Sequence, residues 1–247
     1  MKALITRPSG QSAPLERMLN DAGIETFLLP LLDIQPLPLD PSMRHTLLNL
    51  DHFDAVVVIS PNAAHYGLSV IDTLWPQLPV QQQWFANGQG TAQILAEAGI
   101  APCTPPSGTT TEDLLALPEF HNISGQKWLV IGGTGGRPLL VDTLKARGAS
   151  AIKWAAYQRS CPVVTDAQFT PMIQAVDLLL LSSGEALENL HQIAASTKMD
   201  INVMVAKTLI VSSSRLKQVA QDLGWTNIIV ADGASNQQLT DAVLNHI

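Results

Sequence analysis

An internal repeat of strand, polar turn and helix units constrains this chain more than any other feature. An apolar strand pattern at Lys2–Ile5 recurs at Lys127–Val130, and each copy continues with a loop of small residues and a helix that carries leucines four residues apart. A glycine suited to a left-handed helix cap then follows in both copies. The matching positions are Leu15 and Leu140, Leu19 and Leu144, and Gly23 and Gly148.

More matched segments follow in the same order. They are Asp54–Ser60 with Asp177–Ser183, Gly88–Thr91 with Ser213–Leu216, and Gly99 with Gly224. A last pair consists of capping-box patterns at Thr109–Glu112 and Ser235–Gln238, in which a hydroxyl and an acid or amide satisfy first-turn amides. Buried strands that alternate with helices predict an α/β protein with parallel sheets flanked by helices, and ligands at the carboxyl ends of the strands.

Proline marks the expected linker between two similar lobes. Pro30–Pro41 contains four prolines, and its counterpart in the repeat is Tyr157–Val164. Proline disfavours helix in the residue before it, so both segments are predicted to be extended, as a two-stranded β linker.

Composition excludes several classes of partner. The chain has 247 residues, of which 46% are hydrophobic and 14% charged, with a net charge of −7 and no run of Lys or Arg. This pattern predicts a sizeable core and argues against binding to nucleic acid or an anionic membrane. Cys103 and Cys161 have no metal-ligand or disulfide spacing and are expected to be free, buried thiols of a reducing compartment.

The apolar segments are too short for export or membrane insertion. The apolar run in Met1–Pro8 is interrupted by Arg7 and is too short for a signal peptide. Ala55–Ile59 and Asp177–Leu181 have the length of strands and are far shorter than a membrane-spanning helix. We therefore expect a cytoplasmic protein. The six histidines are scattered, form no metal-binding pair and are assigned mostly to the solvated surface, so no metal is expected.

The most glycine-rich segment, Gly132–Pro138, allows three interpretations. A dinucleotide site would need a G-x-G-x-x-G fingerprint and an acid near position 153, where Lys153 stands. The second interpretation is an anion site in which helix N-terminal amides cradle a carboxylate or phosphate beside Arg137, with Pro138 as the first helical residue. The third is a tight turn without a ligand.

Other helix starts have a similar small and polar composition. Any one of them would be an ordinary N-cap, but together they would supply many uncharged donors for a polyanion. Arg7, Arg137 and Arg215 would add local positive charge. The segments are Ser60–Ala63, Gly88–Thr91, Ser182–Glu185 and Ser212–Arg215.

Candidate catalytic groups are few. The chain has no G-x-S-x-G motif. Glu185 in the first turn of a helix could be a base, but the helix dipole is the better explanation for a carboxylate there. Tyr157 breaks the internal symmetry, because Leu32 stands at its duplicate position. A tyrosine there could donate a proton to a leaving oxygen, or it could be a buried structural residue.

The chain resembles the uroporphyrinogen-III synthase family from end to end. None of the family's motifs is an invariant sequence, so the resemblance rests on the order and spacing of several short segments. The residues that carry it are Ile5–Pro8, Ser60–Ala63, Gly88 with Thr91 and Ala92, Gly135–Arg137 with Leu144 and Gly148, Tyr157–Arg159, Ser182–Glu185, Val211–Leu216 and Leu223–Trp225.

The resemblance implies a cofactor-free enzyme that converts a linear tetrapyrrole polycarboxylate, hydroxymethylbilane, to uroporphyrinogen III. The hydroxyl leaves as water, and a spiro intermediate inverts the terminal ring before closure. Tyr157 matches the tyrosine proposed to assist departure of the hydroxyl. The matching cleft positions are Thr6, Ser60, Ala63, Gly88, Thr91, Ser182, Ser183 and Ser213, to which the turns above add Arg7, Asn62, Gly135, Arg137 and Gly184 as candidate substrate-binding residues.

One departure concerns charge. Family members often carry an arginine just before the glycine turn, where this chain has Ile131 and Gly132, so Arg137 becomes the nearer candidate for a carboxylate contact. The resemblance also implies lobes formed by residues 1–36 with 160–247 and by residues 39–157, with hinge strands near 33–38 and 157–163. It implies a monomer that allows transient contact with the preceding pathway enzyme.

Two other functions stay open at this stage. A non-catalytic bilobal module that binds a small anion would close on its ligand without turnover. A nucleotide-dependent oxidoreductase depends on the glycine turn, whose fingerprint is incomplete.

Overall fold

The computed structural model describes residues 1–246 and divides into two compact units. Unit 1 consists of Met1–Ile34 and the chain from Ser160 onward, and unit 2 consists of Gln35–Arg159. The chain passes from unit 1 to unit 2 within β3 (Asp33–Pro36) and leaves unit 2 at the end of β7 (Ser150–Ser160). No helix among the described residues is long and apolar enough to cross a membrane.

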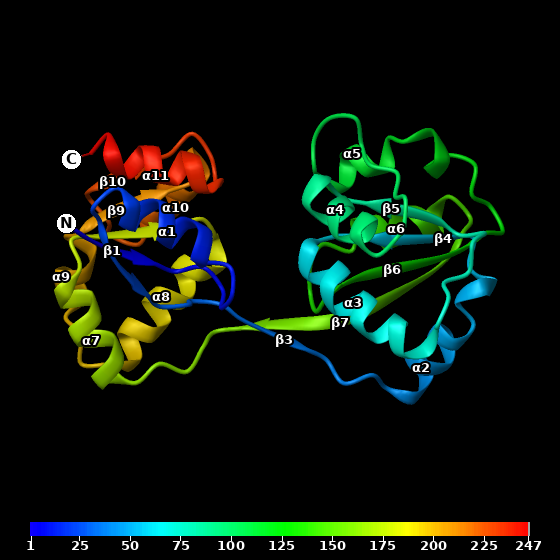
Figure 1. Ribbon diagram of the computed structural model, residues 1–247, viewed down its shortest axis with the longest axis horizontal. Coiled ribbons are helices and arrows are strands. Elements are labelled where there is room, and N and C mark those ends of the chain that lie inside the picture. The colour runs from blue at the N-terminus through cyan, green and yellow to red at the C-terminus, as the bar shows by residue number, and fades with distance from the viewer. Residues whose placement is uncertain (247) are drawn as a thin grey trace. The chain divides into compact units, whose positions relative to one another are not determined.

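Unit 1 is built on a five-stranded sheet of order β10-β9-β8-β1-β2, in which all paired strands are parallel (Figure 1). Its strands are β1 (Lys2–Ile5), β2 (Glu25–Leu28), β8 (Leu178–Leu181), β9 (Thr208–Val211) and β10 (Ile228–Val230). Its helices are α1 (Ala13–Asp21), α7 (Asp166–Ala175), α8 (Gly184–Ser196), α9 (Ile201–Val205), α10 (Ser214–Asp222) and α11 (Asn236–Leu244).

Alternate strand residues of this sheet enter two separate cores. Leu4, Leu179 and Leu209 pack with residues of α7, α8, α9 and α10. Their neighbours Ile5 and Leu180 face the opposite side, where residues of α1 and α11 cover them. Because both faces are buried, β8 is apolar throughout, and β1 and β9 are apolar after their first residues, Lys2 and Thr208. This is expected for a parallel sheet between two helical layers.

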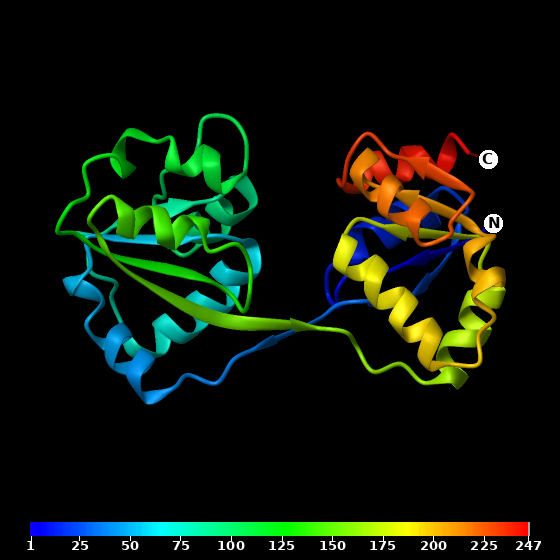
Figure 2. The same cartoon turned by 180° about the vertical axis from the view of Figure 1, so that it is seen from behind.

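Unit 2 has a second sheet, of order β3-β7-β6-β4-β5. Strands β4 (Ala55–Val58), β5 (Gln83–Ala86), β6 (Lys127–Gly133) and β7 are mutually parallel (Figure 2). The helices are α2 (Pro41–Leu48), α3 (Pro61–Leu74), α4 (Gln89–Glu97), α5 (Thr111–Leu115) and α6 (Leu139–Ala146), with short 3₁₀ helices at Leu50–His52 and Pro118–Phe120. In the core shared with α5 and α6, the rings of Phe85 and Trp128 stack, and Phe120 packs against both at steeper angles.

The two sheets repeat the same strand order once the duplicated segments are matched. The order β9-β8-β1-β2 in unit 1 corresponds to β5-β4-β6-β7 in unit 2. Cys103, which forms a parallel bridge with Phe85 at the edge of β5, stands in the place that β10 takes in unit 1. The predicted α/β fold with two parallel sheets flanked by helices is confirmed.

Both sheets are centred on strands from different halves of the chain. β1 pairs with β8, and β6 pairs with β4. The Lys2 N–H donates to Asp177 Oδ2 at 2.8 Å, and the Asp177 N–H donates back to the Lys2 carbonyl at 2.8 Å. The duplicate residues do the same, since Lys127 N–H donates to Asp54 Oδ2 at 2.7 Å and Asp54 N–H to the Lys127 carbonyl at 2.9 Å.

The predicted helix-capping glycines occupy the left-handed region in both copies. Gly23 and Gly148 follow α1 and α6 with φ of 81° and 87°. In each case the next residue donates back to a carbonyl near the helix end, Ile24 to Leu19 at 2.9 Å and Ala149 to Leu144 at 3.1 Å. This is the Schellman pattern, in which the glycine lets the chain reverse while satisfying terminal carbonyls.

Two predictions of detail were wrong. The first capping box is one residue later than expected, at Thr110 and Asp113, because the Glu112 side chain is bound to Arg137 instead. Cys103 is exposed rather than buried, since it lies at the outer edge of its sheet, and Cys161 is half-buried. The other predicted box, Ser235 with Gln238, is confirmed.

Replacing Asp54 or Asp177 by alanine should lower the free energy of unfolding by about 1 kcal/mol each, because the lysine N–H at the start of the central strand loses its partner. The double variant should lose the sum, since the two carboxylates share no partner. Urea unfolding followed by circular dichroism measures the loss. Asp54→Asn keeps an acceptor oxygen and serves as the control, and an unchanged midpoint in both alanine variants would contradict the assignment.

Gly148→Ala should destabilise the protein more than Gly23→Ala. Both changes place a side chain in the left-handed region, at a cost of roughly 1–2 kcal/mol. A Cβ at Gly23 meets nothing within 4 Å, whereas one at Gly148 would lie 2.8 Å from Ser124 Oγ and 3.2 Å from its Cα. Scanning calorimetry compares the two melting temperatures, and equal losses would show that the Ser124 contact is unimportant.

Candidate functional site

The predicted site residues lie where parallel strands end. In unit 1 they follow β1, β8 and β9, which are neighbours in the sheet. In unit 2 they follow β4, β5 and β6, and Tyr157 lies on β7 near its carboxyl end. Each unit thus brings its own set of predicted residues to one edge of its own sheet, where the ligands of parallel α/β folds bind.

After β1, the side chains of Thr6 and Arg7 bind other parts of unit 1. Thr6 is buried, and its Oγ1 donates to the Leu180 carbonyl at 2.7 Å. Arg7 donates to the Asn236 side chain and to the Ala234 carbonyl, the latter at 2.7 Å. Partial burial lowers the pKa of the Arg7 guanidinium. These bonds tie the end of β1 to β8 and to the start of α11.

The serines after β8 and β9 cap helices. Ser183 Oγ accepts from the Ala186 N–H at 3.4 Å at the start of α8, and Ser213 Oγ accepts from the Leu216 N–H at 3.3 Å at the start of α10. Ser182 contributes its carbonyl, which accepts from Ser212 Oγ at 3.4 Å. The N-termini of α8 and α10 therefore lie next to each other with their dipoles directed at this edge.

In unit 2, Ser60 and Gly88 begin helices after β4 and β5. Ser60 Oγ accepts from the Ala63 N–H at 3.1 Å at the start of α3, where Asn62 is half-buried. Gly88 caps α4 with φ of 133°, a conformation that other residues rarely adopt, and has no side chain with which to bind the first-turn amides. Thr91 is buried one turn later.

The structure brings Tyr157 and Ser60 together. The Tyr157 hydroxyl lies 3.1 Å from Ser60 Oγ, and the tyrosine is only 5% exposed. Its ring stacks on the ring of Tyr66 from α3, with centroids 5.9 Å apart and 29° between the planes. Sequence reasoning missed Tyr66, because nothing in the chain pattern distinguishes it from a helix residue that packs in the core.

The glycine-rich segment divides into two parts with different roles. Gly132 and Gly133 belong to β6, while Gly135 and Gly136 form the turn with φ of 68° and 77°. Lys153 Nζ donates to the Gly135 carbonyl and holds this turn from β7. The sequence pattern predicts no structural role for Lys153, which stands where a nucleotide fingerprint would need an acid. Pro138 caps α6, which begins at Leu139, one residue later than predicted.

Arg137 is already paired with a carboxylate of the protein. Its guanidinium donates to both oxygens of Glu112, at 2.6 and 2.9 Å, and both side chains are largely exposed. The hydrogen bonds from Arg137 are the main cause that lowers the pKa of Glu112, and the same pair raises the pKa of Arg137. No pattern in the chain indicates this partner, which lies 25 residues away in the sequence.

Most histidines are exposed as expected, but His191 is not. It is half-buried, and its Nε2 accepts from the indole N–H of Trp225 at 2.9 Å. Burial lowers the pKa of this imidazole. Residues 1–246 contain no group of three or more histidine, cysteine or acidic side chains placed to hold a metal ion.

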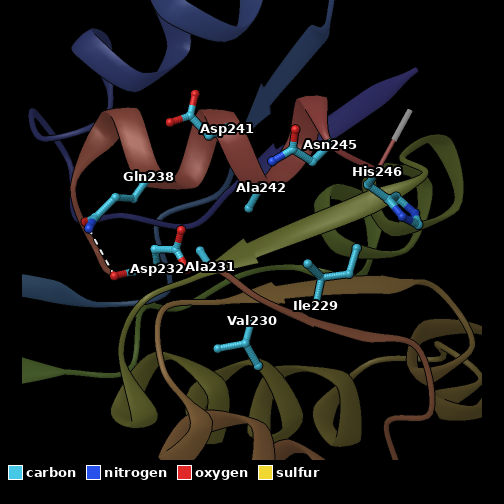
Figure 3. A pocket seen from close by; sticks show the side chains of 9 residues that line it. All are labelled: Ile229, Val230, Ala231, Asp232, Gln238, Asp241, Ala242, Asn245 and His246. Carbon is cyan, nitrogen blue, oxygen red and sulfur yellow. Dashed lines mark hydrogen bonds between the residues drawn. The ribbon is translucent and has the colours of Figure 1, made fainter.

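One cavity of unit 1 is not lined by any of the predicted residues. This cavity of about 310 Å³ lies beside β10 and α11, with Asp232, Asp241 and His246 among its lining residues (Figure 3). There Gln238 Nε2 donates to the Asp232 carbonyl at 3.0 Å. A smaller cavity of about 100 Å³ in unit 2 is lined by Gly135, Arg137 and Lys153, at the carboxyl edge of its sheet.

Comparison with known proteins identifies the family. The family model described as "Uroporphyrinogen-III synthase HemD" matches residues 13–241. The uroporphyrinogen-III synthase of Escherichia coli K12 is 33% identical over 250 residues, which cover 98% of this chain and 100% of that protein. The enzyme of Salmonella typhimurium is 33% identical over 247 residues, which cover the same shares of the two chains.

Solved structures share the fold. Mutant uroporphyrinogen III synthase from Thermus thermophilus aligns with a TM-score of 0.65 at 15% identity, over 100% of this chain and 97% of that chain. The enzyme from Helicobacter pylori aligns with a TM-score of 0.63 at 15% identity, over 100% of both chains. The family model and the full-length relatives establish that this chain belongs to the uroporphyrinogen-III synthase family.

Proposed function

We propose that this chain cyclises hydroxymethylbilane to uroporphyrinogen III and that Tyr157 donates the proton with which the hydroxyl leaves as water. The observation that supports this assignment is the Tyr157 hydroxyl, 3.1 Å from Ser60 Oγ at the carboxyl edge of the second sheet. The electrophilic azafulvene left behind is attacked by the substituted carbon of the last pyrrole. The resulting spiro intermediate then opens and recloses with that ring inverted.

Ser60 favours proton donation by Tyr157. Its oxygen accepts from the Ala63 N–H, and its own hydrogen can then point to the Tyr157 oxygen. In that arrangement the phenolic hydrogen is available to the substrate hydroxyl. The Ser60 hydrogen bond and the N-terminus of α3 also stabilise the phenolate that proton transfer leaves. Ser60 thus contributes through Tyr157.

The remaining predicted residues suit the carboxylates of the substrate. We assign this role to first-turn amides at the starts of α3 and α4 in unit 2 and of α8 and α10 in unit 1, because helix N-termini bind anions. Among the predicted residues, Asn62 and Gly184 lie in these first turns, and Gly135 lies in the turn before α6. The amides of Ala63 and Thr91 already donate to Ser60 Oγ and to the Gly88 carbonyl, so we assign these two residues to shaping the edge. Such uncharged donors let a chain with a net charge of −7 bind a polyanion. Holding the flexible substrate in one orientation accounts for the choice of isomer.

Arg137 needs a modified role. Both terminal nitrogens of the Arg137 guanidinium donate to Glu112. A substrate carboxylate would therefore have to displace that glutamate or bind beside the pair. Thr6 and Arg7 are likewise bound to neighbouring groups, so we assign them to shaping the end of β1.

The isomer of the product tests the proposed activity. Freshly generated hydroxymethylbilane is supplied to the protein, the product is oxidised, and the porphyrin isomers are separated by chromatography. We expect isomer III in excess over a control without protein, in which the substrate closes spontaneously to isomer I. Isomer I alone, with the substrate bound, would instead favour an anion-binding module without turnover.

Tyr157→Phe should lower kcat by roughly 10² and leave KM nearly unchanged, because the ring stays while the proton donor is lost. Initial rates of isomer III formation over a range of substrate concentrations give both constants. Circular dichroism and thermal unfolding of the variant confirm that the fold is retained. A rate equal to that of the unchanged protein would return Tyr157 to a structural role.

A further inference from the structure

We propose that Gly133 is a positioning residue for Tyr157, whose phenol reaches Ser60 only because the last residue of β6 lacks a side chain. This inference rests on the proposed role of Tyr157 as proton donor. It assigns to the glycine-rich segment a task that neither a phosphate-binding turn nor a tight turn explains.

Because of the strand order, the Tyr157 side chain must cross β6 at Gly133 to reach Ser60. Tyr157 is on β7, Ser60 follows β4, and β6 lies between these two strands. The registers of β6 and β7 shift between Gly132 and Gly133, so that Gly132 is opposite Ala155 and Gly133 is opposite Tyr157. This irregularity acts as a bulge, which commonly redirects a side chain near a functional site.

There is no room for a methyl group at Gly133. A Cβ built there would lie 2.7 Å from Tyr157 Cζ, 2.9 Å from Cε2 and 3.1 Å from the hydroxyl oxygen. Carbon atoms in good contact lie about 3.5–4.0 Å apart, so either the ring or the strand would have to move. The conflict involves the end of the ring that carries the hydroxyl.

The ring has little freedom to yield without losing its position. Thr134 N–H donates to the Tyr157 carbonyl at 2.9 Å and fixes the backbone beside it. The Tyr66 ring stacks on the phenol, and Ser60 binds the hydroxyl. A side chain at Gly133 would therefore displace the hydroxyl from Ser60, and a misplacement of about 1 Å can cost 10²-fold in rate.

Gly133→Ala is the test, and Gly132→Ala is its matched control. A Cβ at Gly132 would lie 2.7 Å from Ile59 Cδ1 and 3.2 Å from its Cγ1, so it meets an aliphatic side chain that can change rotamer and not the Tyr157 ring. We expect Gly133→Ala to lower kcat by roughly 10- to 100-fold with little change in KM, while Gly132→Ala stays near the unchanged protein. Gly133→Ala with a normal kcat beside a slow Tyr157→Phe would overturn the inference and leave the proposed function intact.

The double variant separates positioning from a general structural effect. If Gly133 acts through the hydroxyl, Gly133→Ala combined with Tyr157→Phe should be no slower than Tyr157→Phe alone. Multiplied losses would overturn the inference. Tyr157→Phe at full rate would instead contradict the proton-donor role itself.

Thermal unfolding covers the case in which Gly133→Ala folds poorly. The loss of melting temperature should be large in the unchanged background and small in Tyr157→Ala, where the colliding ring is gone. An equal loss in both backgrounds would show that Gly133 is needed for β6 itself and not for Tyr157.

Discussion

The pairing of β1 with β8 and of β6 with β4 is the constraint on which the rest of the molecule depends. Each pair joins strands from different halves of the chain and begins with an aspartate that exchanges hydrogen bonds with a lysine backbone. These bonds set the register in the middle of each sheet. Since the register decides which residue stands last on each strand, it also decides which groups reach the carboxyl edge.

At the carboxyl edge of unit 2, close packing and chemistry depend on the same atoms. Ser60 both caps α3 and binds the Tyr157 hydroxyl, so the residue that starts the helix also orients the candidate proton donor. The shift between Gly132 and Gly133 brings the tyrosine opposite a residue without a side chain. A change in either the cap or the strand end would therefore act on the same hydroxyl.

Two of the arginines predicted to bind substrate are bound to other groups of the protein. The carboxylate of Glu112 is bound to Arg137 and not to the helix cap, a role that Asp113 takes. Arg7 is likewise satisfied by Asn236 and Ala234. Both guanidinium groups thus already have hydrogen-bond partners within the protein. This is consistent with a polycarboxylate that is bound largely through neutral donors. A guanidinium can bind both oxygens of one carboxylate. At Arg137 the carboxylate bound in this way is that of Glu112.

Local patterns were enough to predict the units and their ends. Apolar strands, paired leucines, serine caps and glycine stops report local backbone preferences, so Gly23, Gly148, Ser60 and Ser213 were assigned correctly from the chain alone. Only the tertiary structure could decide which strands become neighbours and where long side chains end. Tyr66 on Tyr157, Lys153 on Gly135 and Glu112 on Arg137 join separate elements, and the empty space at Gly133 exists only once β6 and β7 are in register. Such contacts depend on distances between segments, which no local preference encodes.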